Sequence, residues 1–212
     1  MGNIGAVVLA AGLSKRFGGE SKLLADLGGE PLVRHAVRAV AESGLADVVV
    51  VTGREAGACR DALRDLPVQF VHNPKWEDGM GSSIACGVAA LDADLAGAFI
   101  VPGDMPFITP DLLRTLMAAF SETGERRAVF PTSPAGEQRT PVLWPRHLLS
   151  RLRSLSGAEG GKSLLKSIAG DALGVTIADQ SLLTDVDTAE DMDAARQHLH
   201  AAGSPAVSRH RL

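Results

Sequence analysis

Residues 4–22 read IGAVVLAAGLSKRFGGESK, a short apolar run followed at once by a loop rich in glycine and in basic residues. The apolar run has the length and the β-branched content of a buried strand. Glycines in the loop let backbone N–H groups come close to an anion, and the basic side chains add positive charge within one short segment. The loop glycines are Gly12, Gly18 and Gly19, and the basic residues are Lys15, Arg16 and Lys22. The stretch therefore predicts a strand followed by a phosphate-binding loop.

This loop differs from the two common glycine fingerprints. It contains no G-x-x-x-x-G-K-[ST], and no G-x-G-x-x-G follows the first strand. Taken alone, the loop can also be interpreted as a glycine-rich turn with solvated basic residues. The motifs in the rest of the chain distinguish this turn from a phosphate-binding loop.

Apolar β-branched runs alternate with helical patterns along the rest of the chain, which is typical of a doubly wound sheet. The expected strands are 5–10, 47–52, 68–72, 96–101, 128–132, 141–144 and 174–178, and the expected helices are 31–43, 82–91, 110–122, 146–152, 162–168 and 189–202. We therefore expect a single-domain, Rossmann-like α/β fold with a mostly parallel sheet over residues 1–202. Residues 203–212 are expected to form a short disordered tail.

The composition favours a compact enzyme over a binder of nucleic acid or membrane. The chain has 212 residues, of which 45% are hydrophobic, so it can bury one substantial core. Its net charge of −4 lacks the basic excess that phosphate-rich surfaces attract. No apolar stretch approaches the roughly twenty residues of a membrane span, and no basic segment precedes the first apolar run. We therefore expect a cytoplasmic protein with neither nucleic-acid nor membrane partners.

Cysteine and histidine give no sign of a metal centre. Cys59 and Cys86 are far apart and lack a C-x-x-C or Cys/His spacing. Cys59 lies on a predicted helix, and both thiols are interpreted as small buried or half-buried side chains. The six histidines form neither H-E-x-x-H nor an i, i+4 pair on one helix.

The first loop has the spacing L-A-A-G-x-S-x-R-x-G-(x3)-K, which resembles the signature of nucleotidyltransferases that activate a phosphorylated acceptor. Three later segments follow in order: GMGSS at 79–83, GDMP at 103–106 and DVDTAED at 185–191. Together, over roughly residues 5–200, they resemble the molybdopterin cytidylyltransferase branch of the molybdenum cofactor nucleotidyltransferases. The resemblance implies a nucleotidyltransferase-type fold and transfer of CMP from CTP to the phosphate of molybdopterin, with release of pyrophosphate.

That reaction brings two anions together, so the protein must neutralise charge and hold the reactants in line. Arg16 and Lys22 are the candidates for neutralisation, and Asp104 completes the expected catalytic set. Asp104 follows an expected strand, at the edge where open α/β sheets bind ligands. Asp104 and Asp187 are expected to bind Mg²⁺, which prefers oxygen ligands.

Two neighbouring carboxylates compete with Asp187 for the metal. Asp185 and Asp191 are the rivals, and Thr188 with Asp191 can equally form a capping pair at the start of the last helix. The resemblance favours Asp187, because the segment matches the family's D-x-D-T-P-E-D. Ala189 stands where that pattern has proline, a change that removes no functional group.

The nucleotide is expected to lie over the first loop and two later turns. Ser82 and Ser83 either cap the following helix or hydrogen-bond the pyrimidine, and backbone at Gly81 allows close approach. Because the guanylyl-type enzymes of the family carry L-A-G-G, Ala11 favours CTP. The expected nucleotide-binding residues are Leu9, Ala10, Ala11, Gly12, Leu13, Ser14, Arg16, Lys22, Gly81, Ser82, Ser83, Pro102, Gly103 and Asp104.

The acceptor side departs from the family pattern. Where the cytidylyltransferases show G-H-P this chain has RTP at 139–141, and where they show G-D-x-G-A-R it has GAEGGK at 157–162. Pro141, Gly160 and Lys162 are the expected acceptor contacts. If these segments touch the acceptor, it can differ from molybdopterin and be a sugar phosphate, a methylerythritol phosphate or a phospholactate.

A non-catalytic nucleotide-binding or cofactor-binding chaperone is the alternative from a different functional class. Arg16, Lys22, Asp104 and Asp187 argue against it, because a binding module has no need of two metal carboxylates. A molybdenum hydroxylase apoenzyme, as the recipient of the product, is implied by the resemblance alone.

Overall fold

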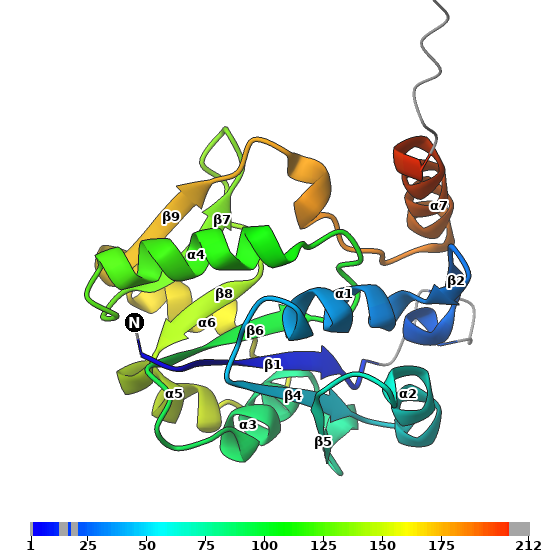
Figure 1. The fold of residues 1–212 in the computed structure, drawn as a ribbon. Coiled ribbons are helices and arrows are strands. Elements are labelled where there is room, and N and C mark those ends of the chain that lie inside the picture. The colour runs from blue at the N-terminus through cyan, green and yellow to red at the C-terminus, as the bar shows by residue number, and fades with distance from the viewer. Residues whose placement is uncertain (1, 13–16, 18–20, 204–212) are drawn as a thin grey trace, which may run out of the picture.

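A seven-stranded sheet forms the centre of the computed structural model, which describes residues 2–12, 17 and 21–203 (Figure 1). Its strands are β1 (Ile4–Ala10), β4 (Asp47–Thr52), β5 (Gln69–His72), β6 (Gly97–Pro102), β7 (Ala128–Thr132), β8 (Val142–Pro145) and β9 (Ala172–Thr176). Across the sheet the order is β5-β4-β1-β6-β8-β7-β9. A separate antiparallel hairpin is formed by β2 (Asp26–Leu27) and β3 (Glu30–Pro31).

Most neighbouring strands run parallel. β1 pairs in parallel with β4 and β6, β4 with β5, and β7 with β9, whereas β8 is antiparallel to β6 and β7. The expected α/β fold with a mostly parallel sheet is confirmed. The carboxyl ends of β1, β4, β5 and β6 meet at one edge of the sheet, which is where such folds bind ligands.

Helices cover both faces of the sheet (Figure 1). They are α1 (Leu32–Ala41), α2 (Ala56–Leu63), α3 (Met80–Ala90), α4 (Pro110–Glu122), α5 (Arg146–Arg153), α6 (Gly161–Ser167) and α7 (Ala189–Gly203). Short 3-10 turns are η1 (Lys22–Leu24), η2 (Trp76–Asp78), η3 (Ala169–Asp171) and η4 (Gln180–Leu183). α1, α2, α4 and α7 bury side chains in one core, and α3, α5 and α6 in the other. Within the described part of the chain, none of these helices has the length and apolarity to cross a membrane.

The central strands are apolar throughout because both of their faces are covered. Along β1, Ala6 and Val8 face the core under α1, while Val7 faces the core under α3. β4 and β6 show the same alternation, with Val50 in the first core and Val51 in the second. This explains why these strands read as unbroken hydrophobic runs in the sequence.

Gly87 brings α3 close to the sheet. A Cβ at this position would lie 2.3 Å from Val7 Cγ1 and 2.6 Å from Val51 Cγ2, distances at which atoms overlap. A side chain would push the helix away from β1 and β4, so glycine lets α3 pack closely on these two strands.

Several elements differ from the sequence prediction at their ends. The helix expected at 82–91 begins at Met80, because Gly79, with a φ of 121°, is its N-cap; neither Ser82 nor Ser83 caps it. The last strand lies at Ala172–Thr176 instead of 174–178, because its pairing with β7 places Ala172 opposite Ala128. The β2–β3 hairpin was not expected, and α2 was expected only as the helical surroundings of Cys59. α7 includes Gly203, and residues 204–212 of the expected tail lie outside the described residues.

Candidate active site

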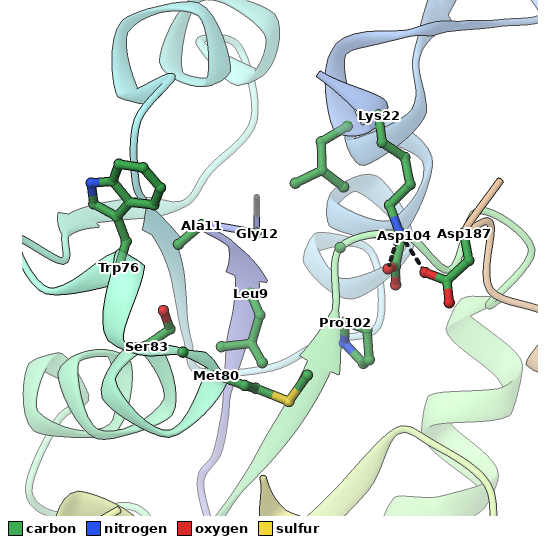
Figure 2. A pocket seen from close by; sticks show the side chains of 13 residues that line it. Leu9, Ala11, Gly12, Lys22, Trp76, Met80, Ser83, Pro102, Asp104 and Asp187 are labelled. Atoms are coloured by element: carbon green, nitrogen blue, oxygen red, sulfur yellow. Dashed lines mark hydrogen bonds and ion pairs between the residues drawn. The ribbon is translucent and has the colours of Figure 1, made fainter. Parts of the chain in front are cut away.

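A cleft of about 360 Å³ lies at the carboxyl edge of the sheet, between the ends of β1 and β6 and the start of α3 (Figure 2). Polar and charged groups stand at its two ends, with apolar side chains between them. Its lining residues are Leu9, Ala11, Gly12, Lys22, Leu23, Trp76, Gly79, Met80, Ser83, Pro102, Gly103, Asp104 and Asp187. Most of the nucleotide-binding residues expected from the described part of the sequence therefore share one cavity.

At one end of the cleft, Lys22 lies between two carboxylates (Figure 2). Its Nζ donates to Asp104 Oδ2 at 2.8 Å and to Asp187 Oδ1 at 2.9 Å. Burial would lower the pKa of Lys22, but the negative charges and hydrogen bonds of Asp104 and Asp187 outweigh it and raise the pKa above its usual value. The ammonium is therefore charged at neutral pH, although only 10% of the side chain is exposed.

Backbone hydrogen bonds bring the two carboxylates together from distant parts of the chain. The N–H of Gly103 donates to the carbonyl of Leu9 at 3.0 Å, which fixes the turn that carries Asp104 against the end of β1. The N–H of Val186 donates to the carbonyl of Asp104 at 2.9 Å. This second bond holds the segment before α7 against the turn after β6, so Asp187 lies beside Asp104.

The three aspartates that were candidates for binding the metal have different surroundings. Asp191 Oδ2 accepts the N–H groups of Asp187 and Thr188 at 3.0 and 2.8 Å, while Thr188 Oγ1 accepts the N–H of Asp191 at 3.1 Å. The hydrogen bonds from Thr188 and from the two N–H groups lower the pKa of Asp191. Asp191 therefore forms the capping pair at the start of α7, Asp185 is exposed, and Asp187 is the aspartate of the three that lines the cleft.

The carboxylate pair fits a divalent cation. Asp104 Oδ2 and Asp187 Oδ1 both lie within 2.9 Å of Lys22 Nζ, so the two carboxylates stand close enough to share one small cationic group. Asp104 Oδ1 is buried and has no hydrogen-bond partner among the residues that the structure describes. Carboxylate oxygens are the ligands that Mg²⁺ prefers, and this ion needs only one or two of them beside phosphates and water.

The opposite end of the cleft is a polar turn that leads from β5 into α3. Asn73 is buried and donates through Nδ2 to Ser82 Oγ at 2.9 Å and to Ser83 Oγ at 3.1 Å. Ser82 Oγ also contacts the carbonyls of Lys75 and Gly79 at 2.7 and 2.8 Å. Ser82 thus stabilises the turn from outside the cleft, whereas Ser83 lines it.

At Gly81 a loop of the protein itself packs closely against the backbone. Its N–H donates to the carbonyl of Gly157 at 2.9 Å, and a Cβ there would lie 2.6 Å from the carbonyl oxygen of Glu159. Gly81 is therefore packed under the loop at 154–160 and is absent from the cleft lining. The expectation that a ligand approaches this backbone does not match the arrangement, because the loop occupies the space.

The remaining expected site residues lie at the margin of the cleft or beyond it. Gly160 lies beside the Met80 thioether, since a Cβ on it would be 3.4 Å from Sδ. Pro141 and Lys162 do not line the cleft, and Ala10 lines a smaller recess with Arg54 and Cys59. The expected contacts Leu13, Ser14 and Arg16 lie outside the described residues.

The turn at 79–83, expected beside the nucleotide, supplies Gly79, Met80 and Ser83 to the cleft. Sequence reasoning missed Trp76 and Leu23, which also line the cleft, and Asn73, which lies behind it and contacts Ser83. A signal for Asn73 was present, because a polar residue directly after a strand stands at the ligand-binding edge. Trp76 carried no such signal, since an isolated aromatic side chain is usually part of a core.

The MobA-like NTP transferase domain matches residues 6–173 of this chain. Among curated proteins, the bifunctional protein GlmU of Geobacter metallireducens is 31% identical over 133 residues, which are 62% of this chain and 28% of that protein. GlmU of Kineococcus radiotolerans is 37% identical over 121 residues, which are 56% of this chain and 25% of that protein. The chain therefore spans only a minor part of the length of these relatives.

Solved structures share the fold over nearly the whole chain. Rv0371c of Mycobacterium tuberculosis has a TM-score of 0.79 at 22% identity, and the match covers 92% of this chain and 98% of Rv0371c. A manganese complex of Rv0371c has a TM-score of 0.73 at 21% identity, with the same coverage of 92% of this chain and 98% of the other. A nucleotidyl transferase of Methanothermobacter has a TM-score of 0.78 at 23% identity, covering 95% and 99%. CMP:2-keto-3-deoxy-manno-octonic acid synthetase with CTP has a TM-score of 0.71 at 15% identity, covering 94% and 99%. Because the matched range covers most of the chain, from within β1 into β9 and including the cleft residues up to Asp104, this chain belongs to the MobA-like NTP transferase domain family.

Proposed function

We propose that the protein is a nucleotidyltransferase that transfers CMP from CTP to the phosphate of a molybdopterin-type acceptor and releases pyrophosphate. The observation that carries the proposal is the cluster of Lys22, Asp104 and Asp187 at the end of a nucleotide-sized cleft, in a chain of the NTP transferase family. The CTP complex of a structural neighbour and Ala11 in the first loop both support a pyrimidine nucleotide.

In this reaction an oxygen of the acceptor phosphate attacks the α-phosphorus of the triphosphate. The bond from this phosphorus to the oxygen that bridges to the β-phosphate breaks, and pyrophosphate leaves with the electron pair. A phosphate monoester is ionised at neutral pH, so no general base is required. The Lys22 ammonium would stabilise the negative charge that gathers on the phosphate oxygens. Arg16, beyond the described residues, is proposed to share this role.

Asp104 and Asp187 would hold Mg²⁺ beside the triphosphate. When bound, the ion supplies positive charge to phosphate oxygens and helps to align them. The buried Asp104 Oδ1 without a described partner supports a divalent metal at this position, and the manganese complex of Rv0371c supports a divalent metal in a protein of this fold. The Asp191 capping pair would orient Asp187, because it fixes the N–H groups of Asp187 and Thr188.

The acceptor side of the chain departs from the cytidylyltransferase pattern. Lys162 and Pro141 stand outside the cleft, and RTP and GAEGGK replace the segments that the cytidylyltransferases carry. These departures favour a second candidate, the same nucleotidyl transfer to another phosphorylated acceptor such as a sugar phosphate. For the molybdopterin product, a molybdenum hydroxylase apoenzyme is the proposed recipient.

Pyrophosphate release tests the proposal directly. The purified protein is assayed with Mg²⁺ and each of CTP, UTP, GTP and ATP, with molybdopterin or a sugar phosphate as acceptor. We expect kcat/KM with CTP to exceed that with GTP by at least about tenfold, or ~1.4 kcal/mol of differential transition-state binding. Equal use of CTP and GTP would contradict the nucleotide assignment. Tight CTP binding without turnover on any acceptor would instead support a chaperone.

A further inference from the structure

Asn73 is a buried polar residue to which the proposed reaction assigns no role. It lies directly after β5, is 3% exposed, and reaches the cleft through Ser83. Its Oδ1 accepts the N–H of Lys75 at 2.9 Å. Because a backbone N–H can only donate, the atom that faces it must be the amide oxygen. The amide nitrogen of Asn73 therefore points to the hydroxyls of Ser82 and Ser83.

This orientation decides what Ser83 offers to a ligand. Its Oγ accepts a hydrogen bond from Asn73, and its own hydrogen has no acceptor among the residues that the structure describes. The carbonyl one turn earlier, to which a helical serine commonly donates, belongs to Gly79 and lies 2.8 Å from the Ser82 hydroxyl. Ser83 is only 5% exposed, so an unused donor there costs free energy until a ligand supplies an acceptor.

We infer that Asn73 is a positioning residue that presents the Ser83 hydroxyl to the cleft as a hydrogen-bond donor. The group it recognises is an acceptor atom on the edge of a pyrimidine base, and the inference rests on the proposed nucleotidyltransferase function. The carbonyl O2 and ring nitrogen N3 of cytosine are acceptors of this kind. Ser83 lies on the α3 side of the cleft, across from the Lys22 end, so a base there leaves the charged end to the phosphates (Figure 2).

Asn73→Asp tests the donor assignment, because the two side chains have the same shape. The introduced carboxylate can still accept from Lys75, but it cannot donate to Ser83, whose hydrogen then turns toward that carboxylate and away from the cleft. We expect the Kd for CTP with Mg²⁺, measured by calorimetry, to rise about tenfold, the size expected for one reversed hydrogen bond. Asn73→Ala should raise the Kd less, because the Ser83 hydroxyl then stays free to rotate. A rise in KM at nearly constant kcat should accompany both changes.

A double-mutant cycle separates positioning from a general structural effect. If Asn73 acts through Ser83, Asn73→Asp should weaken CTP binding in the natural chain and cause no further loss in Ser83→Ala. An equal loss in both backgrounds would overturn the inference. Should Asn73→Asp fail to fold, the same cycle with Asn73→Ala decides the question, and additive losses again overturn it.

Ser82→Ala provides the matched control, since this serine accepts from the same amide but lies outside the cleft. It should lower the melting temperature while raising the Kd for CTP less than Ser83→Ala does; a larger rise would contradict the assignment of Ser83. Binding needs no acceptor, so the outcome is independent of the acceptor's identity. If none of the four nucleotides binds, the proposed function fails; if CTP binds and the cycle is additive, only the role of Asn73 fails.

Discussion

Among single residues, Lys22 has the largest expected effect on the charge balance of the site, because its ammonium lies between two carboxylates. Methionine has a similar length and no charge, so Lys22→Met leaves Asp104 and Asp187 facing each other without the ammonium between them. We expect kcat/KM for pyrophosphate release to fall about a hundredfold, as is common when one charge-stabilising group is lost. Lys166→Met, at an exposed position on α6 outside the cleft, is the control. A similar loss in both variants would contradict the role of Lys22.

The raised pKa of Lys22 sets a pH dependence for stability. A group whose pKa is higher in the folded state stabilises the fold below its unfolded value, here 10.5, and this contribution is lost as the pH rises through the folded value. The difference in melting temperature between the natural chain and Lys22→Met should therefore stay constant from about pH 6 to about pH 9. A difference that shrinks steadily across this range would show that another group is responsible.

At the scale of elements, the strands and the order of the motifs could be predicted from the sequence. Long apolar runs and helix-starting prolines are local signals, so β4, β7 and α4 agree with the expected bounds. The turn at 79–83 was expected beside the nucleotide, but the rest of the α3 side of the cleft could not be predicted, because it depends on where the turn after β5 goes and on how the loop at 154–160 packs over Gly81. Those contacts join residues far apart in the chain, and no local sequence pattern predicts them.

Gly81→Ala tests this packing, and Gly57→Ala serves as a comparison with the opposite expected sign. Gly81→Ala places a Cβ 2.6 Å from the carbonyl oxygen of Glu159, so the loop at 154–160 must move, and we expect a loss of about 1–3 kcal/mol in the free energy of unfolding. Gly57→Ala lies within α2, where a Cβ meets nothing within 4 Å, and should stabilise the protein by about 0.5–1 kcal/mol. Denaturant unfolding measures both values. A stabilising Gly81→Ala would refute the packing described here.

The capping pair at the start of α7 gives a second prediction about a single element. Asp191→Asn keeps an oxygen that can accept both N–H groups but removes the negative charge at the start of α7, so it should lower the free energy of unfolding at pH 7 by about 0.3–1 kcal/mol. Because the folded pKa of Asp191 is lowered, its contribution is present above the unfolded value of 3.8 and is lost as the pH falls through the folded value. The two proteins should therefore become equally stable in acid. A difference that persists unchanged in acid would mean that the carboxylate charge is not responsible.

The whole molecule is needed to assemble the charged end of the cleft. Lys22 follows the first loop, Asp104 follows the central strand β6, and Asp187 precedes the final helix, so the three meet only when the sheet is complete. The bond from the Val186 N–H to the Asp104 carbonyl ties the end of the chain to the middle of the sheet. The sequence predicts Lys22 in the loop after the first strand, Asp104 at the end of a strand and Asp187 just before the last helix, and the order of the strands in the sheet brings the three together.

This arrangement predicts that Asp104 and Asp187 act as a unit. If both hold one divalent cation, Asp104→Asn or Asp187→Asn alone should abolish most pyrophosphate release, and the double variant should be little worse than the worse single one. Binding of Mn²⁺ in the presence of CTP, followed by electron paramagnetic resonance, gives a second readout, and each variant should lose it. Asp185→Asn, at an exposed carboxylate two residues from Asp187 and outside the cleft, is the matched control and should be much milder. Independent, multiplicative losses from the two aspartates, with Mn²⁺ still bound by each single variant, would show that they serve different steps.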